Sequence, residues 1–242
     1  MKIFNNILIA IDNAGLSNVF YHASLFIIIA SLFVWCYWFS RKMGMKTKTA
    51  IILGASTYAA MQLWMRLYAW ASTGFRFIGA MNNIYMFLAA PVFLILMSKI
   101  LKIKWRDACY MIAPFMVLQQ AIALFECTFV GCCRGYACSW GIYSIKLDYY
   151  YIPIQQINSL LNYLIFAFLI VRAKKNNYKS DPYQYPLMLI IVGAVRIVCE
   201  FFHDNEKGIL GLSEHARHAA LMVIVGVIAT VIIKHKEKKQ TI

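Results

Sequence analysis

The sequence predicts an all-α membrane protein with seven transmembrane helices, and three observations support this fold class. Of the 242 residues, 62% are hydrophobic and only 14% are charged, with a mean hydropathy of +0.63. No ordinary soluble domain has this composition. Seven apolar runs approach the roughly 20 residues that a helix needs to cross a bilayer. Basic residues cluster between these runs, so we expect one integral membrane domain over residues 1–242.

The predicted spans follow one another along the chain. They cover Val19 to Phe39, Ala50 to Trp70, Ala80 to Met97, Ala108 to Val130, Ile152 to Val171, Tyr185 to Phe202 and Ala219 to Ile233. Before them, the first seventeen residues contain a short apolar run, Ile7 to Ile11, without a basic start or a small-residue cleavage site. We interpret this stretch as an interfacial segment and not as a removable signal.

The placement of the basic residues predicts the orientation of the chain. Clusters of four follow the first, third, fifth and seventh spans: Arg41, Lys42, Lys46 and Lys48; Lys99, Lys102, Lys104 and Arg106; Arg172, Lys174, Lys175 and Lys179; Lys234, Lys236, Lys238 and Lys239. Seven crossings place these sixteen of the 24 basic residues on one side and six on the other. Because basic loops stay in the cytoplasm, we expect an outer amino terminus and a cytoplasmic carboxyl terminus. The net charge of +14 then reflects topology, with contact to membrane lipid as a secondary role and no nucleic-acid partner.

Two charges stand within the sixth span. Arg196 and Glu200 are four residues apart in the apolar stretch Leu187 to Phe202, so an α-helix places them on one face. A charge at the middle of a bilayer costs about 2.5 to 3.5 kcal/mol on insertion scales, which plain anchoring does not require. We therefore predict a functional site at this pair. The alternative is a buried salt bridge that only fixes helix packing.

Every ionisable residue within a predicted span falls in the outward half of that span. Arg66 is near the outer end of the second span, Glu126 near that of the fourth, and Arg196 and Glu200 in the outer half of the sixth. This distribution favours a single polar cavity open to the outer leaflet, because isolated charges facing lipid remain unpaired. The planar fork of arginine suits a phosphate. Mutual neutralisation of the four charges in structural pairs is the alternative.

The longest outward loop runs from Gly131 to Tyr151. Gly131 and Gly135 bracket two cysteines and Arg134, which allows tight turns and close approach to a ligand. At the end of the loop, Tyr149, Tyr150 and Tyr151 fit an interfacial aromatic belt.

The seven cysteines divide into two groups. Cys36, Cys109 and Cys199 lie in or beside apolar spans and are expected to act as small hydrophobes. The outward group, Cys127, Cys132, Cys133 and Cys138, matches no zinc spacing and has no interleaved histidine, so we expect no metal. A disulfide that involves Cys138 stays open, and so does the state of Cys132 and Cys133.

Four blocks of residues occur in an order that is typical of a known family. They are Ala113-Pro114 with Leu118-Gln119-Gln120-Ala121-Ile122, Cys127, Phe129, Gly131-Cys132-Cys133 and Gly135; Pro153-Ile154-Gln155; Arg196-Ile197-Val198-Cys199-Glu200-Phe201-Phe202; and Leu212-Ser213. These blocks resemble the signatures of the prolipoprotein diacylglyceryl transferases, multi-pass proteins of the bacterial inner membrane. The resemblance covers just over half of the chain.

The resemblance implies a defined chemistry that needs no cofactor. Such an enzyme transfers the diacylglyceryl group of phosphatidylglycerol to the lipobox cysteine thiol of a lipoprotein precursor peptide and releases glycerol phosphate. Cations hold the phosphate, and a base removes the thiol proton. On this interpretation Arg196 clamps the phosphate, and Glu200 orients Arg196 or a lipid hydroxyl, which makes both residues catalytic. The expected substrate-binding residues are Arg66, Gln119, Glu126, Gly131, Arg134, Gly135, Gln155 and His203.

The chain departs from the family pattern at several positions with chemical roles, among them Leu88, Leu124, Ile157 and Asn158, where the last two replace a tyrosine and a glutamate. Leu88 stands where the third-helix motif carries histidine or tyrosine, and Leu124 stands where the fourth-helix motif carries arginine. Tyr85, Tyr136 and His203 are the candidates to replace the base. Catalysis is favoured, and the alternative is a noncatalytic family member that binds phospholipid or a membrane partner. A transporter is disfavoured, because neither repeat halves nor paired broken helices are apparent.

Overall fold

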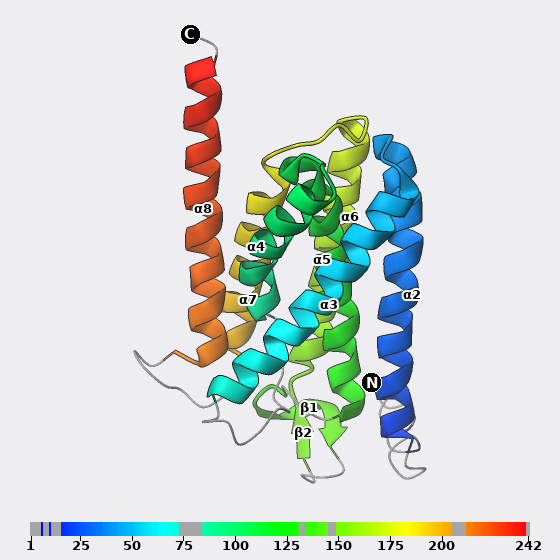
Figure 1. The fold of residues 1–242 in the computed structure, drawn as a ribbon. Helices are drawn as coiled ribbons and strands as arrows, with labels where there is room; N and C mark the ends of the chain where they lie inside the picture. Colours follow the sequence, from blue (N-terminus) through cyan, green and yellow to red (C-terminus); the bar gives the residue numbers. More distant parts are fainter. Residues whose placement is uncertain are drawn as a thin grey trace.

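The protein forms a bundle of long helices that carries one small hairpin (Figure 1). The computed structural model describes residues 16–72, 84–130, 134–144, 149–204 and 212–240, together with Asn6 and Ala10. In this part of the chain the helices are α2 (Ser17–Met43), α3 (Thr47–Ser72), α4 (Ile84–Ile100), α5 (Trp105–Val130), α6 (Ile154–Lys175), α7 (Gln184–Glu200) and α8 (Glu214–Gln240). The strands β1 (Ala137–Ser144) and β2 (Tyr149–Tyr151) pair antiparallel between α5 and α6.

Each of the seven predicted spans corresponds to one helix, with ends that differ by a few residues. Within the described residues, four segments are long and apolar enough to cross a membrane: His22–Met43, Trp105–Phe125, Ile154–Lys175 and Glu214–Lys239. The apolar segment of α4 is shorter, Met86–Ile100, and α7 has 17 residues. The protein is therefore a multi-pass membrane protein, whereas the total of seven crossings and the orientation stay predictions.

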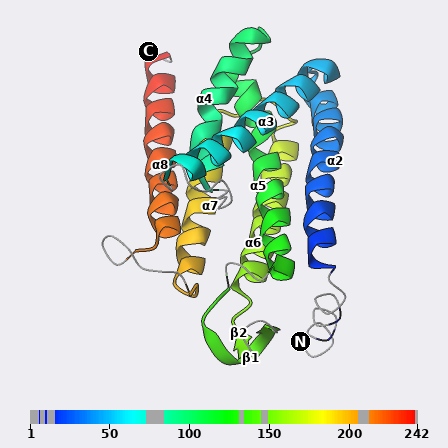
Figure 2. The same ribbon diagram turned by 60° about the horizontal axis from the view of Figure 1, so that its bottom comes forward.

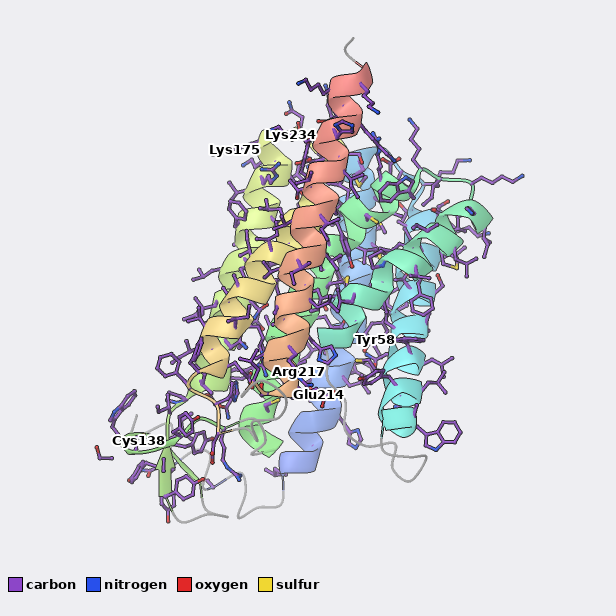
Figure 3. The ribbon with its side chains drawn as sticks, turned by 90° about the vertical axis from the view of Figure 1, so that its left-hand side faces the viewer. Tyr58, Cys138, Lys175, Glu214, Arg217 and Lys234 are labelled. Carbon is purple, nitrogen blue, oxygen red and sulfur yellow. The ribbon has the colours of Figure 1, made fainter. Side chains whose placement is uncertain are left out.

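The bundle has two chemically different ends. The connections α2–α3, α4–α5 and α6–α7 and the carboxyl end of α8 lie together at what we call the lysine-rich end (Figure 1). The four basic clusters belong to these connections and to the end of α8. The hairpin lies at the opposite end of α5 and α6, which we call the hairpin end (Figure 2). Lys175 and Lys234 mark the first end, and Cys138 marks the second (Figure 3).

Helix α5 lies at the centre of the bundle. It packs on α2, α4, α6 and α7, and its segment Ala108 to Val117 is buried. Trp35 of α2 donates its indole N–H to the carbonyl of Met111 at 2.9 Å, and Tyr185 of α7 donates its hydroxyl to the carbonyl of Phe87 in α4 at 2.7 Å. Such bonds matter between membrane helices because lipid tails are as apolar as the helix surfaces.

The hairpin is a feature that the sequence did not predict. In the loop Gly131 to Tyr151, Tyr143 of β1 pairs with Tyr150 of β2, and a bulge separates Ala137 from Ile142. The thiol of Cys138 is free and donates to the carbonyl of Trp140. Cys132 and Cys133 lie outside the described residues. Cys36, Cys109 and Cys199 are free and buried, as expected of small hydrophobes.

Candidate active site

The centre of the candidate site is the predicted pair on α7. The guanidinium Nη2 of Arg196 lies 3.2 Å from Oε2 of Glu200, and each side chain is only 6% exposed. The (i, i+4) spacing thus does place both charges on one helical face. The Nε of Arg196 is buried and has no hydrogen-bond partner among the described residues. Since guanidinium has five N–H donors, the carboxylate leaves donor capacity for an anion.

Ser213, at the start of α8, connects this pair to the next helix. Its hydroxyl donates to Oε1 of Glu200 at 2.6 Å and accepts the backbone N–H of Ala216 at 3.1 Å. The second contact is an N-terminal cap of α8. The same side chain therefore fixes the beginning of α8 and the direction of the Glu200 carboxylate.

The close approach of α7 and α8 sets the position of the pair. A Cβ on Gly193 of α7 would lie 2.8 Å from the carbonyl oxygen of Ala219, and one on Gly226 of α8 would lie 2.8 Å from that of Pro186. Only residues without a side chain permit this spacing, as in other membrane helix pairs. The packing brings the last turn of α7 to the start of α8, where Ser213 meets Glu200.

The loop between α5 and α6 joins the site directly after α7. Gly135 and His203 form an antiparallel bridge, and His203 is buried. Its backbone N–H also donates to the carbonyl of Glu200 at 3.2 Å. Two further backbone bonds of 3.1 Å frame the bridge, from Tyr136 N to Phe202 O and from Asp204 N to Arg134 O. The expected residues Arg134, Gly135 and His203 are thus brought together at the end of α7.

Gly135 has no room for a side chain. A Cβ there would lie 2.6 Å from the carbonyl oxygen of Ile152 and 2.9 Å from that of Phe202. Ile152 precedes α6 and donates its N–H to the carbonyl of Tyr136 at 3.0 Å. Gly135 is therefore wedged between the start of α6 and the end of α7, so residues from two of the four sequence blocks meet here.

Amide side chains line the contact between α5 and α6. Ser159 donates to the carbonyl of Ala121 at 2.7 Å, and Asn162 donates to the carbonyl and to the side-chain oxygen of Asn158. Gln155, in the first turn of α6, is fully buried, and its amide has no hydrogen-bond partner in the described part of the chain. Such groups need water or a ligand in an apolar medium. The α5–α6 contact is therefore polar toward the hairpin end.

For the other expected site residues, the structure shows no hydrogen bond or ion pair with the Arg196–Glu200 pair among the residues that it describes. Gln119 of α5 is buried and donates to the sulfur of Met86 in α4 at 3.5 Å. Arg66 lies on the exposed surface of α3, a helix that packs on α2 and α4. The side chain of Glu126 and the whole of Gly131 lie outside the described residues. No group of three or more metal-binding side chains occurs in the described residues either.

Ser213, directly before α8, and Arg217, within α8, did not figure among the predicted site residues. Ser213 was noticed only as part of a sequence block, and its contact with Glu200 depends on how α8 docks. Arg217, one turn further into α8, has a buried Nε that meets no hydrogen-bond partner among the residues described. It lies toward the hairpin end (Figure 3). A basic residue near the start of a helix is disfavoured by the helix dipole, and this is the signal in the sequence by which Arg217 could have been found.

Comparison with known proteins identifies the family. A profile of the prolipoprotein diacylglyceryl transferases matches residues 46–233. The matched segment contains α3 to α7, most of α8 and every expected site residue. Comparison with curated proteins gives no match. The profile covers well over half of the 242 residues and confirms the resemblance, and the chain therefore belongs to the prolipoprotein diacylglyceryl transferase family.

Proposed function

We propose that the protein transfers the diacylglyceryl group of phosphatidylglycerol to the lipobox cysteine of a lipoprotein precursor in the bacterial inner membrane. The observation that carries this proposal is the buried pair Arg196–Glu200, whose arginine keeps a buried donor without a partner among the described residues. A plain structural pair needs no such spare donor. An anionic phosphate is the ligand that a partly satisfied guanidinium favours.

The reaction forms one bond as it breaks another. The cysteine sulfur forms a thioether with the lipid glycerol carbon while the bond from that carbon to the phosphate oxygen breaks, and glycerol phosphate leaves. Negative charge grows on the departing phosphate, and Arg196 stabilises it. Glu200, held by Ser213 at 2.6 Å, keeps the guanidinium in place. Preorganised charge of this kind is the largest contribution in many enzymes.

His203 is the proposed base for the thiol proton. Its backbone is fixed from two directions, by Gly135 and by the carbonyl of Glu200. The side chain is buried, and His203 follows Glu200 by three residues. Tyr136, another candidate, is exposed, and the side chain of Tyr85 lies outside the described residues. An imidazole is also the common choice for a general base near neutral pH.

Arg217 is the proposed second cation. The family pattern has an arginine where this chain has Leu124, and Leu124 is an apolar residue that is only 5% exposed. The phosphate therefore needs another positive group. Arg217 lies in the first turn of α8, close in sequence to Ser213, with a buried Nε that no described residue binds. It supplies the charge from α8 in place of α5.

The experiment is a transfer assay with purified protein, labelled phosphatidylglycerol and a lipobox peptide, with the thioether product detected by mass spectrometry. Arg196→Ala is expected to lower the rate at least about 100-fold, the usual effect of removing a transition-state donor. Arg172→Ala is the matched control, because Arg172 also pairs with a carboxylate but does so at the connection between α6 and α7, at the lysine-rich end. It should retain at least about half of the rate. Product formation that does not exceed the level of Arg196→Ala would rule out catalysis.

A noncatalytic lipid-binding role is the second candidate, and Leu88 and Leu124 favour it. Both are aliphatic side chains turned into the bundle: Leu124 is buried, and Leu88 packs against the core. Neither supplies a base or a charge. This role predicts saturable binding of phospholipid without turnover, still sensitive to Arg196→Ala. The same protein samples distinguish the two functions, since only the transferase yields thioether.

A further inference from the structure

The lysine-rich end contains a hollow that has no part in the proposed transfer reaction. Its volume is about 630 Å³, which is within the usual range of small-molecule sites. Three connections that are far apart in the sequence form its walls: α2–α3, α4–α5 and α6–α7. Figure 1 shows these connections together at the end of the bundle that lies away from the hairpin.

Five lysines line this hollow, which we call the lysine hollow. They are Lys42 and Lys46 from the first connection, Lys102 and Lys104 from the second, and Lys179 from the third. Asp107 is the sole acid among the lining residues. Membrane topology requires only that lysines lie on one side of the bilayer, not that they surround one concave space. Their convergence therefore indicates a site for an anion.

The backbone of the three connections is held in place. The N–H of Met45 donates to Ser40 at 2.9 Å, that of Ile103 to Ser98 at 3.0 Å, and that of Tyr178 to Ala173 at 2.8 Å, each to a carbonyl oxygen of the preceding helix. The hollow is therefore shaped by the fold and does not depend on an anion to draw its walls together. A preformed site loses less entropy when a ligand binds.

The surroundings of the hollow favour an amphipathic ligand. A second hollow of about 420 Å³ shares Ile103 and Lys104 with it and is also lined by Ile95 and Trp105. Ile95 belongs to an exposed apolar face of α4 together with Val92 and Leu96. A phosphate held by the lysines would thus lie beside a surface suited to acyl chains. A soluble phosphate compound has no acyl chains that could pack on that apolar surface.

We propose that the lysine hollow binds the phosphate headgroup of an anionic phospholipid from the leaflet at the lysine-rich end. The acyl chains lie along the exposed face of α4. This site is separate from the Arg196–Glu200 pair, which lies on the outward turn of α7, and it does not depend on the transferase function. Basic pockets between membrane helices bind anionic lipids by the same attraction.

The test measures lipid binding by the full-length protein in detergent with native mass spectrometry. Phosphatidylglycerol and phosphatidylcholine are titrated in the Arg196→Ala background, so that lipid at the transfer site is not counted. K46Q/K104Q/K179Q removes one lysine from each connection. The matched control, K234Q/K236Q/K238Q, removes the same charge from the exposed end of α8 outside the hollow.

We expect the hollow variant to weaken phosphatidylglycerol binding about tenfold or more, while the α8 variant changes it less than about twofold. Phosphatidylcholine binding should be the same in all variants. The charge-retaining variant K46R/K104R/K179R should bind phosphatidylglycerol like the parent, which separates loss of charge from loss of fold. Equal weakening by both glutamine variants would mean that only bulk surface charge acts and would overturn the proposal. Lysine-dependent binding of soluble glycerol phosphate that is as tight as that of the lipid would overturn it as well.

Discussion

Replacing Glu200 by glutamine tests how the buried pair contributes to stability. The change leaves Arg196 charged in a position where the side chains of the pair are each 6% exposed. Breaking a buried pair from one side destabilises a fold by about 3 to 5 kcal/mol, because the remaining charge stays buried without compensation. We therefore expect Glu200→Gln to lower the free energy of unfolding by about that amount.

The chain offers a matched control for this change. Asp181 pairs with Arg172 at the lysine-rich end, where the arginine side chain is 38% exposed and the aspartate 12%. Asp181→Asn makes the same chemical change, but water can solvate the arginine that is left. Partly exposed pairs contribute about 1 kcal/mol or less, so the expected loss is several times smaller than for Glu200→Gln.

A double replacement shows whether the Arg196–Glu200 pair is required for stability or only for activity. Arg196→Met with Glu200→Leu removes both charges, and buried pairs replaced by apolar residues often leave stability unchanged or raise it by about 1 to 4 kcal/mol. We expect the double variant to be at least as stable as the parent protein and to lack transfer activity. The measurement is reversible unfolding in mixed micelles with increasing sodium dodecyl sulfate, followed by helical circular dichroism. A double variant as unstable as Glu200→Gln would refute the reasoning, since the pair would then be required for the fold.

Three further outcomes can be checked on the same samples. Ser213→Ala removes a hydrogen bond to a carboxylate and a helix cap and is expected to lower the free energy of unfolding by about 3 kcal/mol, whereas Ser213→Thr keeps both contacts and should lower it by less than about 1 kcal/mol. Gly135→Ala pushes a methyl group against two backbone carbonyls and should lower the free energy of unfolding by about 1 to 3 kcal/mol; an unchanged value would mean that the bridge to His203 is absent. The hydrogen bond from Tyr183 to Glu237 raises the pKa of Tyr183 above 10.0, so this bond is lost only as the pH rises through the raised value. Glu237→Gln should return that pKa toward 10.0 in an NMR titration of labelled tyrosine.

Local features of the fold were accessible from the sequence. The length of the apolar runs predicted where each helix lies, because a bilayer sets the length of a span. The pairing of Arg196 with Glu200 was predictable as well. Helix geometry alone places side chains four residues apart on the same face, whatever the rest of the chain does. The sequence blocks pointed to the family that the profile then identified.

Features that depend on packing were not accessible. The contact of Ser213 with Glu200 and the bridge from Gly135 to His203 join residues that are distant in the sequence, and only the docking of helices brings them together. The exposure of Arg66 depends on how α3 is rotated against its neighbours, which its composition does not determine. The hairpin was missed because β2 has only three residues and both strands contain aromatic residues that suit a membrane interface equally well.

The close contact of α7 and α8 at their glycines restricts where a lipid can enter the bundle. Gly193 and Gly226 each press against the neighbouring helix, so prying these two helices apart would open voids on both sides of the seam. We therefore expect α7 and α8 to stay packed together, with Arg196 held at their contact. If the proposed transfer takes place, we expect its lipid to enter between other helices and not between α7 and α8.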